Sequence, residues 1–226
     1  MIRLHRFSTV AGINRAATQA GQTFLLSENF ETPTTGYESG TWTEETFSAT
    51  IDPAYTAGPL VGSQSFRASS ASGWARSISP TFAGASEMWY YFKFRLLVRA
   101  QHFLVAFYNG TTFLAGVALT SGTALVYCPF AVNTTTVGTM VADTTYNGWF
   151  HYKAGTGTDA IADFGFSTTS TRPTSGNNFC SLTNGQATLA PDRIYVGTAA
   201  GVGASTFDYV WDKIRVATSL IDGEPA

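Results

Sequence analysis

The chain has 226 residues, of which 44% are hydrophobic and only 12% charged, and its formal net charge is −2. This length suits one large β-domain whose core needs neither a disulfide nor a metal. The near-neutral charge gives no steering toward nucleic acid or an anionic membrane surface, and no apolar run is long enough to span a membrane. We therefore predict neither nucleic acid nor a membrane as a partner.

Residues 1–23 differ from the rest of the chain, because they contain no Asp or Glu and carry Arg3, Arg6 and Arg15. They lack the continuous apolar stretch of a signal peptide. We predict an arm or a short helix ahead of the domain, with these three arginines as candidate contacts to a partner. The alternative is a disordered tail.

Residues 24–226 alternate between short apolar strands and polar turns. The domain starts with a strand at 24–31, followed by short candidate strands near 47–51 and 64–69. The clearest strand is 88–99. Its even positions are apolar while most of its odd positions are aromatic or basic, which is the period-two pattern of a strand with one buried face.

A β-hairpin is predicted next, because the turn signal Asn109-Gly110 separates the strand 103–108 from the apolar run that follows it. Two longer loops are expected at 31–46 and 168–192. No segment shows a sustained helical period. The sequence therefore predicts an all-β fold, a two-sheet antiparallel β-sandwich (jelly roll) behind a short N-terminal arm. The remaining strands are expected at 123–131, 137–142, 149–154, 161–167, 193–197 and 206–217.

The order of these elements resembles the concanavalin A-like lectin/glucanase (laminin-G-like) jelly roll, of the kind found in bacteriophage virion proteins. The opening LLSENFETP, the W-x-H strand at 149–151 and the closing FDYVWDKIRVATSLI carry this resemblance. Such families pair their first and last strands. That pairing would bring Glu28 and Glu31 near Asp208 and Asp212.

Those four carboxylates are candidate ligands of a structural calcium ion, since Ca²⁺ prefers oxygen donors. The alternative is that they are solvated or bonded to nearby backbone. A structural calcium is the one cofactor that the sequence leaves open.

Catalysis finds little support in the sequence. It lacks the closely spaced acids of a glycosidase and the G-x-S-x-G of an acyl-transfer enzyme. Alginate-lyase-type sandwiches are matched only in part, by Gln101-His102 and by the YKAG run at 152–155. A lyase would need His102, His151, Tyr152 and Arg95 to converge on one sugar. We predict that the protein is not an enzyme.

Two aromatic and basic faces are candidate binding surfaces. Trp89, Tyr91, Lys93 and Arg95 share one face of their strand, and Tyr209 and Trp211 share another with Lys213 and Arg215. Aromatic platforms with polar neighbours bind sugar rings or proteins. The alternative is that the rings are core and the cations extend to its edges.

Two cysteines, Cys128 and Cys180, both lie in apolar settings. Buried thiols and a single bridge between them both remain open.

The functional prediction is a non-enzymatic structural protein, a phage virion accessory component such as a capsid decoration, tail or fibre protein. A composition with only three lysines, the basic arm and the lack of a signal peptide favour it. It would dock through the arm, form a homo-oligomer and contact other virion proteins. We expect it in the virion, assembled in the host cytoplasm, or alternatively outside cells. The alternative function is a carbohydrate-binding module for a surface polysaccharide, followed by a polysaccharide lyase.

Overall fold

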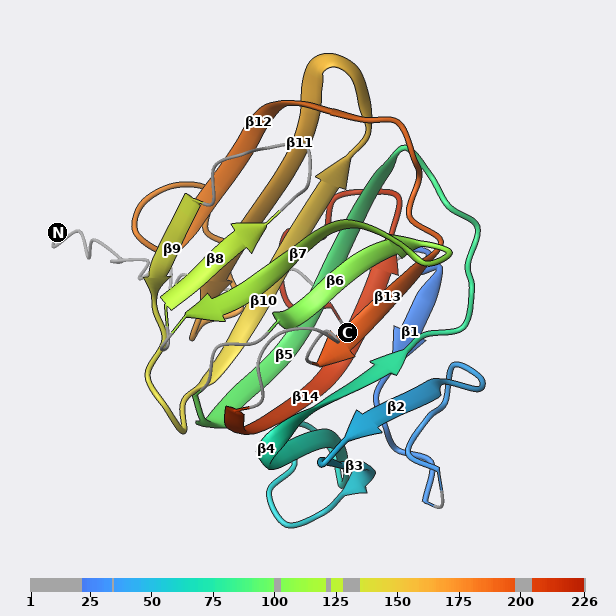
Figure 1. Ribbon diagram of the computed structural model, residues 1–226, viewed down its shortest axis with the longest axis vertical. Coiled ribbons are helices and arrows are strands. Elements are labelled where there is room, and N and C mark those ends of the chain that lie inside the picture. The colour runs from blue at the N-terminus through green and yellow to red at the C-terminus, as the bar shows by residue number, and fades with distance from the viewer. Residues whose placement is uncertain are drawn as a thin grey trace, which may run out of the picture.

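The protein is all-β, as predicted. Every strand pairing is antiparallel. The computed structural model (Figure 1) describes residues 22–33, 35–99, 103–120, 123–127, 135–197 and 205–225. No helix among these residues is long and apolar enough to cross a membrane.

These residues contain fourteen strands and the loops that join them. The strands are β1 Leu26–Glu28, β2 Thr43–Phe47, β3 Thr50–Tyr55, β4 Ser65–Ile78, β5 Glu87–Val98, β6 Phe103–Asn109, β7 Thr112–Thr120, β8 Thr123–Tyr127, β9 Thr135–Thr139, β10 Thr145–Lys153, β11 Gly155–Ser167, β12 Phe179–Ala187, β13 Arg193–Gly197 and β14 Ser205–Ala217.

The strands form one curled sheet whose two halves face each other. Their order is β12-β11-β10-β5-β14-β4-β13-β6-β7-β8-β9, with β1 on β14 and with β2 and β3 on β4. The long strand β4 belongs to both halves, because its first part pairs with β14 and its last part with β13. We call β12, β11, β10, β5, β14, β1, β3 and the first part of β4 the back layer. The rest is the front layer, whose strands β6–β9 pass in front of β10 and β5 in Figure 1.

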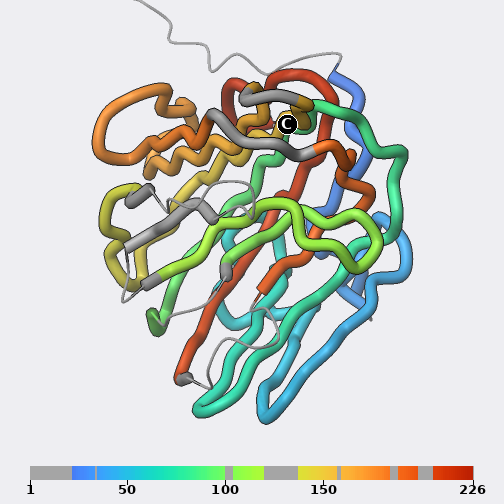
Figure 2. The backbone as a smooth tube through the Cα atoms, turned by 45° about the horizontal axis from the view of Figure 1, so that its top comes forward, coloured from blue at the N-terminus to red at the C-terminus, as the bar shows by residue number. Residues whose placement is uncertain are grey.

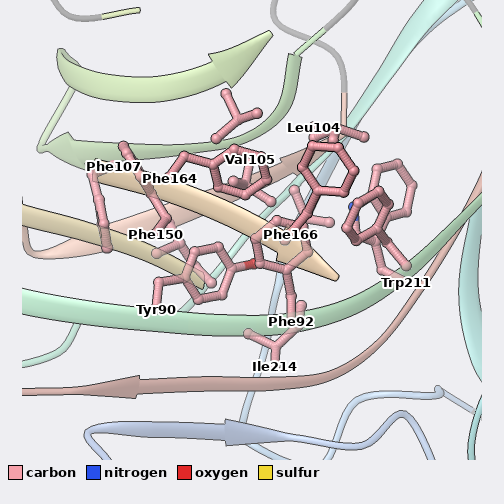
Figure 3. Close-up of a cluster of buried hydrophobic side chains, with 14 of the residues drawn as sticks. Tyr90, Phe92, Leu104, Val105, Phe107, Phe150, Phe164, Phe166, Trp211 and Ile214 are labelled. Carbon is pink, nitrogen blue, oxygen red and sulfur yellow. The ribbon is translucent and has the colours of Figure 1, made fainter. Parts of the chain in front are cut away.

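The space between the layers is filled with aromatic side chains (Figure 3). On β5 the even positions from Tyr90 to Leu96 are at most 1% exposed, as the alternation predicts. Phe107 of the front layer stacks on Phe150 of the back layer with ring centroids 5.2 Å apart. Figure 2, turned by 45°, shows the same two layers as a tube. Burying each such ring stabilises the fold by about 1.5–3 kcal/mol of folding free energy. The shared core therefore holds the two layers, and with them both outward faces, in fixed positions.

The prediction that Tyr209, Trp211, Lys213 and Arg215 share one open face of β14 is wrong. Tyr209 and Trp211 are fully buried between the layers and are not available to a ligand. A bulge then follows in the strand. Lys213 has φ 51°, and the register with β5 shifts between Asp212 and Arg215. Because the bulge reverses the alternation, Arg215 lies on the opposite face of β14 from Trp211. A uniform period of two through this strand is therefore wrong.

Two further elements test the sequence prediction. The first and last strands pair as expected, with Leu26 opposite Val216 and Glu28 opposite Ile214. The region 168–192 is not all loop, since it contains β12. That strand carries Asn184, Gly185 and the two hydroxyl residues Ser181 and Thr183. It takes its strand conformation from its neighbour β11 more than from its own propensity.

Candidate functional site

The predicted face of β5 does point away from the main core, but another segment covers part of it. Tyr91 is fully buried and meets Trp149 edge to face, with ring centroids 5.6 Å apart. Ala217 and Ile221 complete this second cluster. The Trp149 indole Nε1 donates a hydrogen bond to the carbonyl of Gly223 at 3.3 Å. Tyr91 is therefore part of a small outer core beneath residues 218–225, which corrects its assignment to a binding surface.

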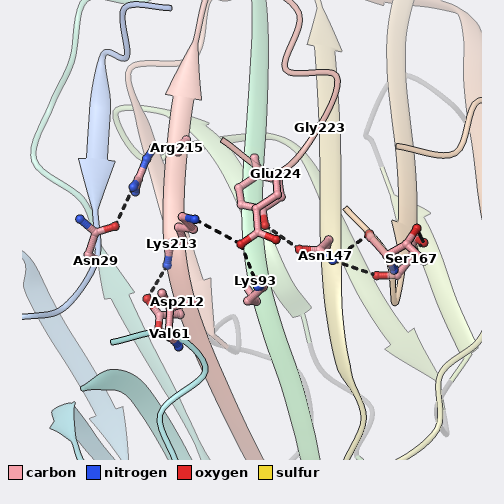
Figure 4. A network of polar contacts seen from close by, with 12 residues as sticks. Asn29, Val61, Lys93, Asn147, Ser167, Asp212, Lys213, Arg215, Gly223 and Glu224 are labelled. Atoms are coloured by element: carbon pink, nitrogen blue, oxygen red, sulfur yellow. Dashed lines mark hydrogen bonds and ion pairs between the residues drawn. The ribbon is translucent and has the colours of Figure 1, made fainter. Parts of the chain in front are cut away.

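Lys93, on the same face, is neutralised by the C-terminal segment (Figure 4). Its Nζ lies 2.8 Å from Glu224 Oε1, and Lys213 Nζ lies 3.2 Å from the same oxygen. Burial alone would raise the pKa of Glu224, but the hydrogen bonds and charges of the two lysines outweigh it and lower the pKa. Lys93 therefore ties the C-terminal segment to the back layer.

Trp89 and Arg95 stand at the two ends of this face. Trp89 stacks on His151 with ring centroids 4.0 Å apart, and the Arg172 guanidinium lies 5.1 Å from the Trp89 ring centre. Arg95 Nη2 donates to the carbonyl of Gly58 at 2.7 Å. Both side chains are occupied by the protein itself, so the four predicted residues do not form one open platform.

Glu28 and Glu31 each hold backbone groups. Glu28 is fully buried, and Glu31 accepts hydrogen bonds from Ser63 and Gln64. Burial alone would raise the pKa of Glu31, but these hydrogen bonds outweigh it and lower the pKa. Both carboxylates therefore fasten loops to the back layer. The donors to Glu28 are the backbone N–H groups of Phe30, Glu38 and Ser39, the Ser39 hydroxyl and the Trp42 indole.

Asp208 and Asp212 are engaged elsewhere. Asp208 forms a bidentate pair with Arg67 at 2.8 and 2.6 Å. Asp212 accepts from the Val61 and Lys213 backbone and from the Ser65 hydroxyl, and burial raises its pKa to about 6. Within the described ranges, no three His, Cys, Asp or Glu side chains are grouped so as to hold a metal. The four candidate calcium ligands therefore do not form a metal site in this part of the chain, and each of them accepts hydrogen bonds from protein donors.

Several predicted residues fall outside the described part of the chain. These are Arg3, Arg6 and Arg15 of the arm, together with His102 and Cys128. Cys180 is buried on β12.

The outward face of the front layer carries a diagonal row of aromatic rings with one arginine at its centre. Phe47 on β2 lies opposite Trp74 on β4. The Arg76 guanidinium lies 5.7 Å from the Trp74 ring and 4.9 Å from the ring of Tyr195 on β13. We call this row, which continues through β6 to β7, the aromatic stripe. Its members are Phe47, Trp74, Arg76, Tyr195, Tyr108 and Phe113.

The far half of the stripe is packed and mostly buried, since Tyr195 and Tyr108 are only 7% and 8% exposed. The rings of Tyr195 and Tyr108 stack with centroids 3.8 Å apart, and Phe113 meets Tyr108 edge to face. Arg76 is held by Glu45, whose Oε2 accepts from Arg76 Nε at 2.7 Å. Arg76 Nη1 has no hydrogen-bond partner among the described residues. At the other end Phe47 is 57% exposed. The stripe therefore combines an exposed ring with a fixed, partly free guanidinium.

Sequence reasoning missed the stripe, because its six residues come from five strands. Trp74, Arg76 and Ile78 do alternate at a period of two and face outward. The signal was weak, since the intervening positions in GWARSI are small. Only the pairing of β2, β4, β13, β6 and β7 brings the rings into one row.

Among the described residues that a lyase would need, His151 and Tyr152 do not meet. His151 and Tyr152 are consecutive on β10 and point to opposite faces. The His151 ring nitrogens lie 3.0 Å from Asp163 and Glu87 on the outer side. Tyr152 is buried in the main core and donates to the carbonyl of Leu189. An acid and a base on opposite sides of a sheet cannot act on one sugar.

No family model and no curated protein sequence matches the chain. Solved structures that resemble it include the PL-14 alginate lyase from Aplysia kurodai, with a TM-score of 0.61 and 6% identity over 87% of this chain and 100% of that one. The endo-β-1,4-glucuronan lyase from the fungus Trichoderma reesei has a TM-score of 0.55 and 12% identity over 90% and 99%. The VIP36 exoplasmic/lumenal domain in its Ca²⁺/Man-bound form has a TM-score of 0.52 and 8% identity over 87% and 90%. At these identities the likeness concerns the fold. The chain therefore has the concanavalin A-like jelly-roll fold that carbohydrate-active lyases and lectins share.

Proposed function

We propose that the protein binds a polysaccharide along the aromatic stripe without cleaving it. The observation that carries this proposal is the row Phe47, Trp74 and Arg76 on the outward face of the front layer. The C–H face of a sugar ring is apolar and packs on aromatic faces. Guanidinium N–H groups donate to the sugar's oxygens. The exposed end of the stripe, from Phe47 through Trp74 to Arg76, offers both kinds of contact side by side, which suits a chain of sugars.

Binding without chemistry fits the protonation of the stripe. Burial raises the pKa of the Tyr108 hydroxyl, although the charge of Arg76 acts in the opposite direction. A tyrosine with a raised pKa stays neutral at physiological pH and donates hydrogen bonds, but it is a poor general base. Neutral Tyr108 therefore supplies no base to the stripe.

The test is calorimetric titration of the full chain with three polysaccharides of defined charge, namely alginate, glucuronan and a neutral β-glucan. The first two are chosen because the structural neighbours are lyases named for them. Replacing Trp74 with alanine should weaken binding about tenfold or more, as expected for a central aromatic contact.

The matched control is Val141→Ala, since Val141 is 62% exposed and lies outside the stripe. Equal affinity of the Trp74→Ala variant and the unaltered protein would refute the stripe as the binding site. The same mixtures should show no rise in ultraviolet absorbance from unsaturated products. Such a rise would favour a lyase.

A place in a phage virion, with a homo-oligomer docking through residues 1–23, remains a separate prediction. It depends on the arm, and residues 1–21 lie outside the described part of the chain. It is compatible with carbohydrate binding, because the stripe lies on β2, β4, β13, β6 and β7, which are separate from residues 1–23. Deleting residues 2–22 and measuring the molar mass in solution by light scattering tests it. An oligomer that persists after the deletion would argue against the arm.

A further inference from the structure

A cleft of about 450 Å³ lies in the back layer, where β3, β4, β14 and β5 run side by side. Thr50 lies opposite Ser69, which lies opposite Asp208. Asp208 also lies opposite Val98. This volume is within the range of about 300–1,000 Å³ typical of small-molecule sites. None of these residues belongs to the aromatic stripe.

An ion pair forms the polar wall of the cleft. Arg67 Nε and Nη2 donate to the two oxygens of Asp208, and the guanidinium lies 4.9 Å from the Tyr55 ring centre. Two parallel bonds and the ring beneath hold this pair in a fixed plane. Arg67 Nη1 has no hydrogen-bond partner within the described ranges, and each Asp208 oxygen keeps a lone pair. The pair therefore offers donors and acceptors side by side.

The local charge selects against anionic ligands. Asp208 neutralises Arg67, and Asp52 lies opposite Arg67 on β3. A carboxylate, phosphate or sulfate would meet two acids for one cation and would be repelled. A neutral ligand avoids this repulsion.

Hydroxyl groups line the remaining wall. The Ser70 and Thr206 hydroxyls donate to backbone carbonyls. Those of Ser69 and Thr50 have no hydrogen-bond partner in the described part of the chain. Val98, which is 42% exposed, adds an apolar surface. The cleft thus places unused polar groups next to an apolar side chain, a combination found in small-molecule sites.

We propose that this cleft binds the neutral terminal hexose of a glycan. Two neighbouring hydroxyls of the sugar would bridge Arg67 Nη1 and Asp208, a third would bond Ser69, and the C–H face would pack on Val98. This goes beyond binding along the stripe, because it is a second site with a different preference for charge. It does not depend on the stripe.

The test uses the full chain and saturation-transfer NMR with the methyl glycosides of glucose, galactose and mannose. Glucuronate serves as the anionic comparison. At least one neutral glycoside should show transfer and shift the backbone amides of Thr50 and Ser69, while glucuronate shows less. Ser69→Ala should weaken binding about three- to tenfold, the loss of one hydrogen bond, without affecting the fold.

Two further variants make the outcome decisive. Arg67→Gln should abolish the amide shifts at Thr50 and Ser69, and Trp74→Ala should leave those shifts unchanged. Lack of transfer from all three neutral glycosides would overturn the proposal. So would unchanged amide shifts at Thr50 and Ser69 in both the Ser69→Ala and the Arg67→Gln variants, or a loss of these shifts in the Trp74→Ala variant. In the last case the sugar would be on the stripe, and the proposed function would stand without this second site.

Discussion

The outward faces of the back and front layers are built from the same kinds of residues, aromatic rings alternating with cations. On the back layer, residues 218–225 cover Tyr91 and Trp149, and Lys93 is bonded to Glu224. On the front layer, Phe47 at one end of the stripe is 57% exposed. A period of two therefore specifies which residues share a face. Whether that face is open depends on a segment that returns from elsewhere in the chain.

The largest expected effect comes from replacing one tryptophan on each face with alanine. Trp149→Ala should cost about 3–5 kcal/mol of unfolding free energy, because it empties the outer core beneath the C-terminal segment. Trp74→Ala, its matched partner on the front layer, should cost less than about 1 kcal/mol. Urea denaturation measures both. Equal costs would mean that the two faces are covered alike.

The next effect concerns Asp212, which the loop around Val61 covers on the back layer. Burial raises the pKa of this carboxyl to about 6, above its unfolded value of about 3.9, so the folded state binds the proton more tightly. Its contribution to stability is complete below about pH 4 and falls as pH rises through 6, by on the order of 2–3 kcal/mol. Asp212→Asn removes this dependence.

The measurement is the difference in unfolding free energy between the unaltered protein and Asp212→Asn across this pH range. As pH rises, the unfolding free energy of the unaltered protein should fall relative to that of Asp212→Asn. A constant difference would contradict a raised pKa at Asp212.

Glu224, a neighbour on the covered face, should show the opposite sign. Burial alone would raise its pKa, but the two lysines outweigh this and lower it. Its contribution is therefore present above the unfolded value of about 4.3 and is lost as pH falls through the lowered pKa. Glu224→Gln should cost about 1 kcal/mol at neutral pH and nothing in strong acid. A cost that persists in strong acid would show that the effect comes from packing.

The smallest change in stability is expected at the exposed end of the stripe. Phe47→Ser should alter the unfolding free energy by less than about 0.5 kcal/mol, because the ring is mostly in solvent. It should nevertheless weaken polysaccharide binding. Calorimetric unfolding and titration on the same sample separate the two effects. A large loss of stability would show that the Phe47 ring is packed against other residues and is not mostly in solvent.

How far the sequence predicts the site can be seen in β5 and β14. In β5 the alternation places Tyr90, Phe92 and Phe94 in the core and Tyr91 on the other side, as predicted. In β14 the same rule fails at Lys213, because a bulge is a backbone feature that leaves no mark in hydrophobic periodicity. The residues of the stripe could not be grouped, since they meet only through pairings of distant strands.

The sequence by itself determined that the fold is all-β and antiparallel and which face of β5 is core, whereas the pairing of the first and last strands was implied only by the resemblance to a known fold family. The fold class and the core face follow from short-range alternation and turn signals, which act within a strand and its hairpin. Only the tertiary structure decided which outward face stays open and which carboxylates are already bonded. It also decided that Arg67 and Asp208 share a cleft. These depend on contacts between residues far apart in the chain, and a local pattern holds no information about such contacts.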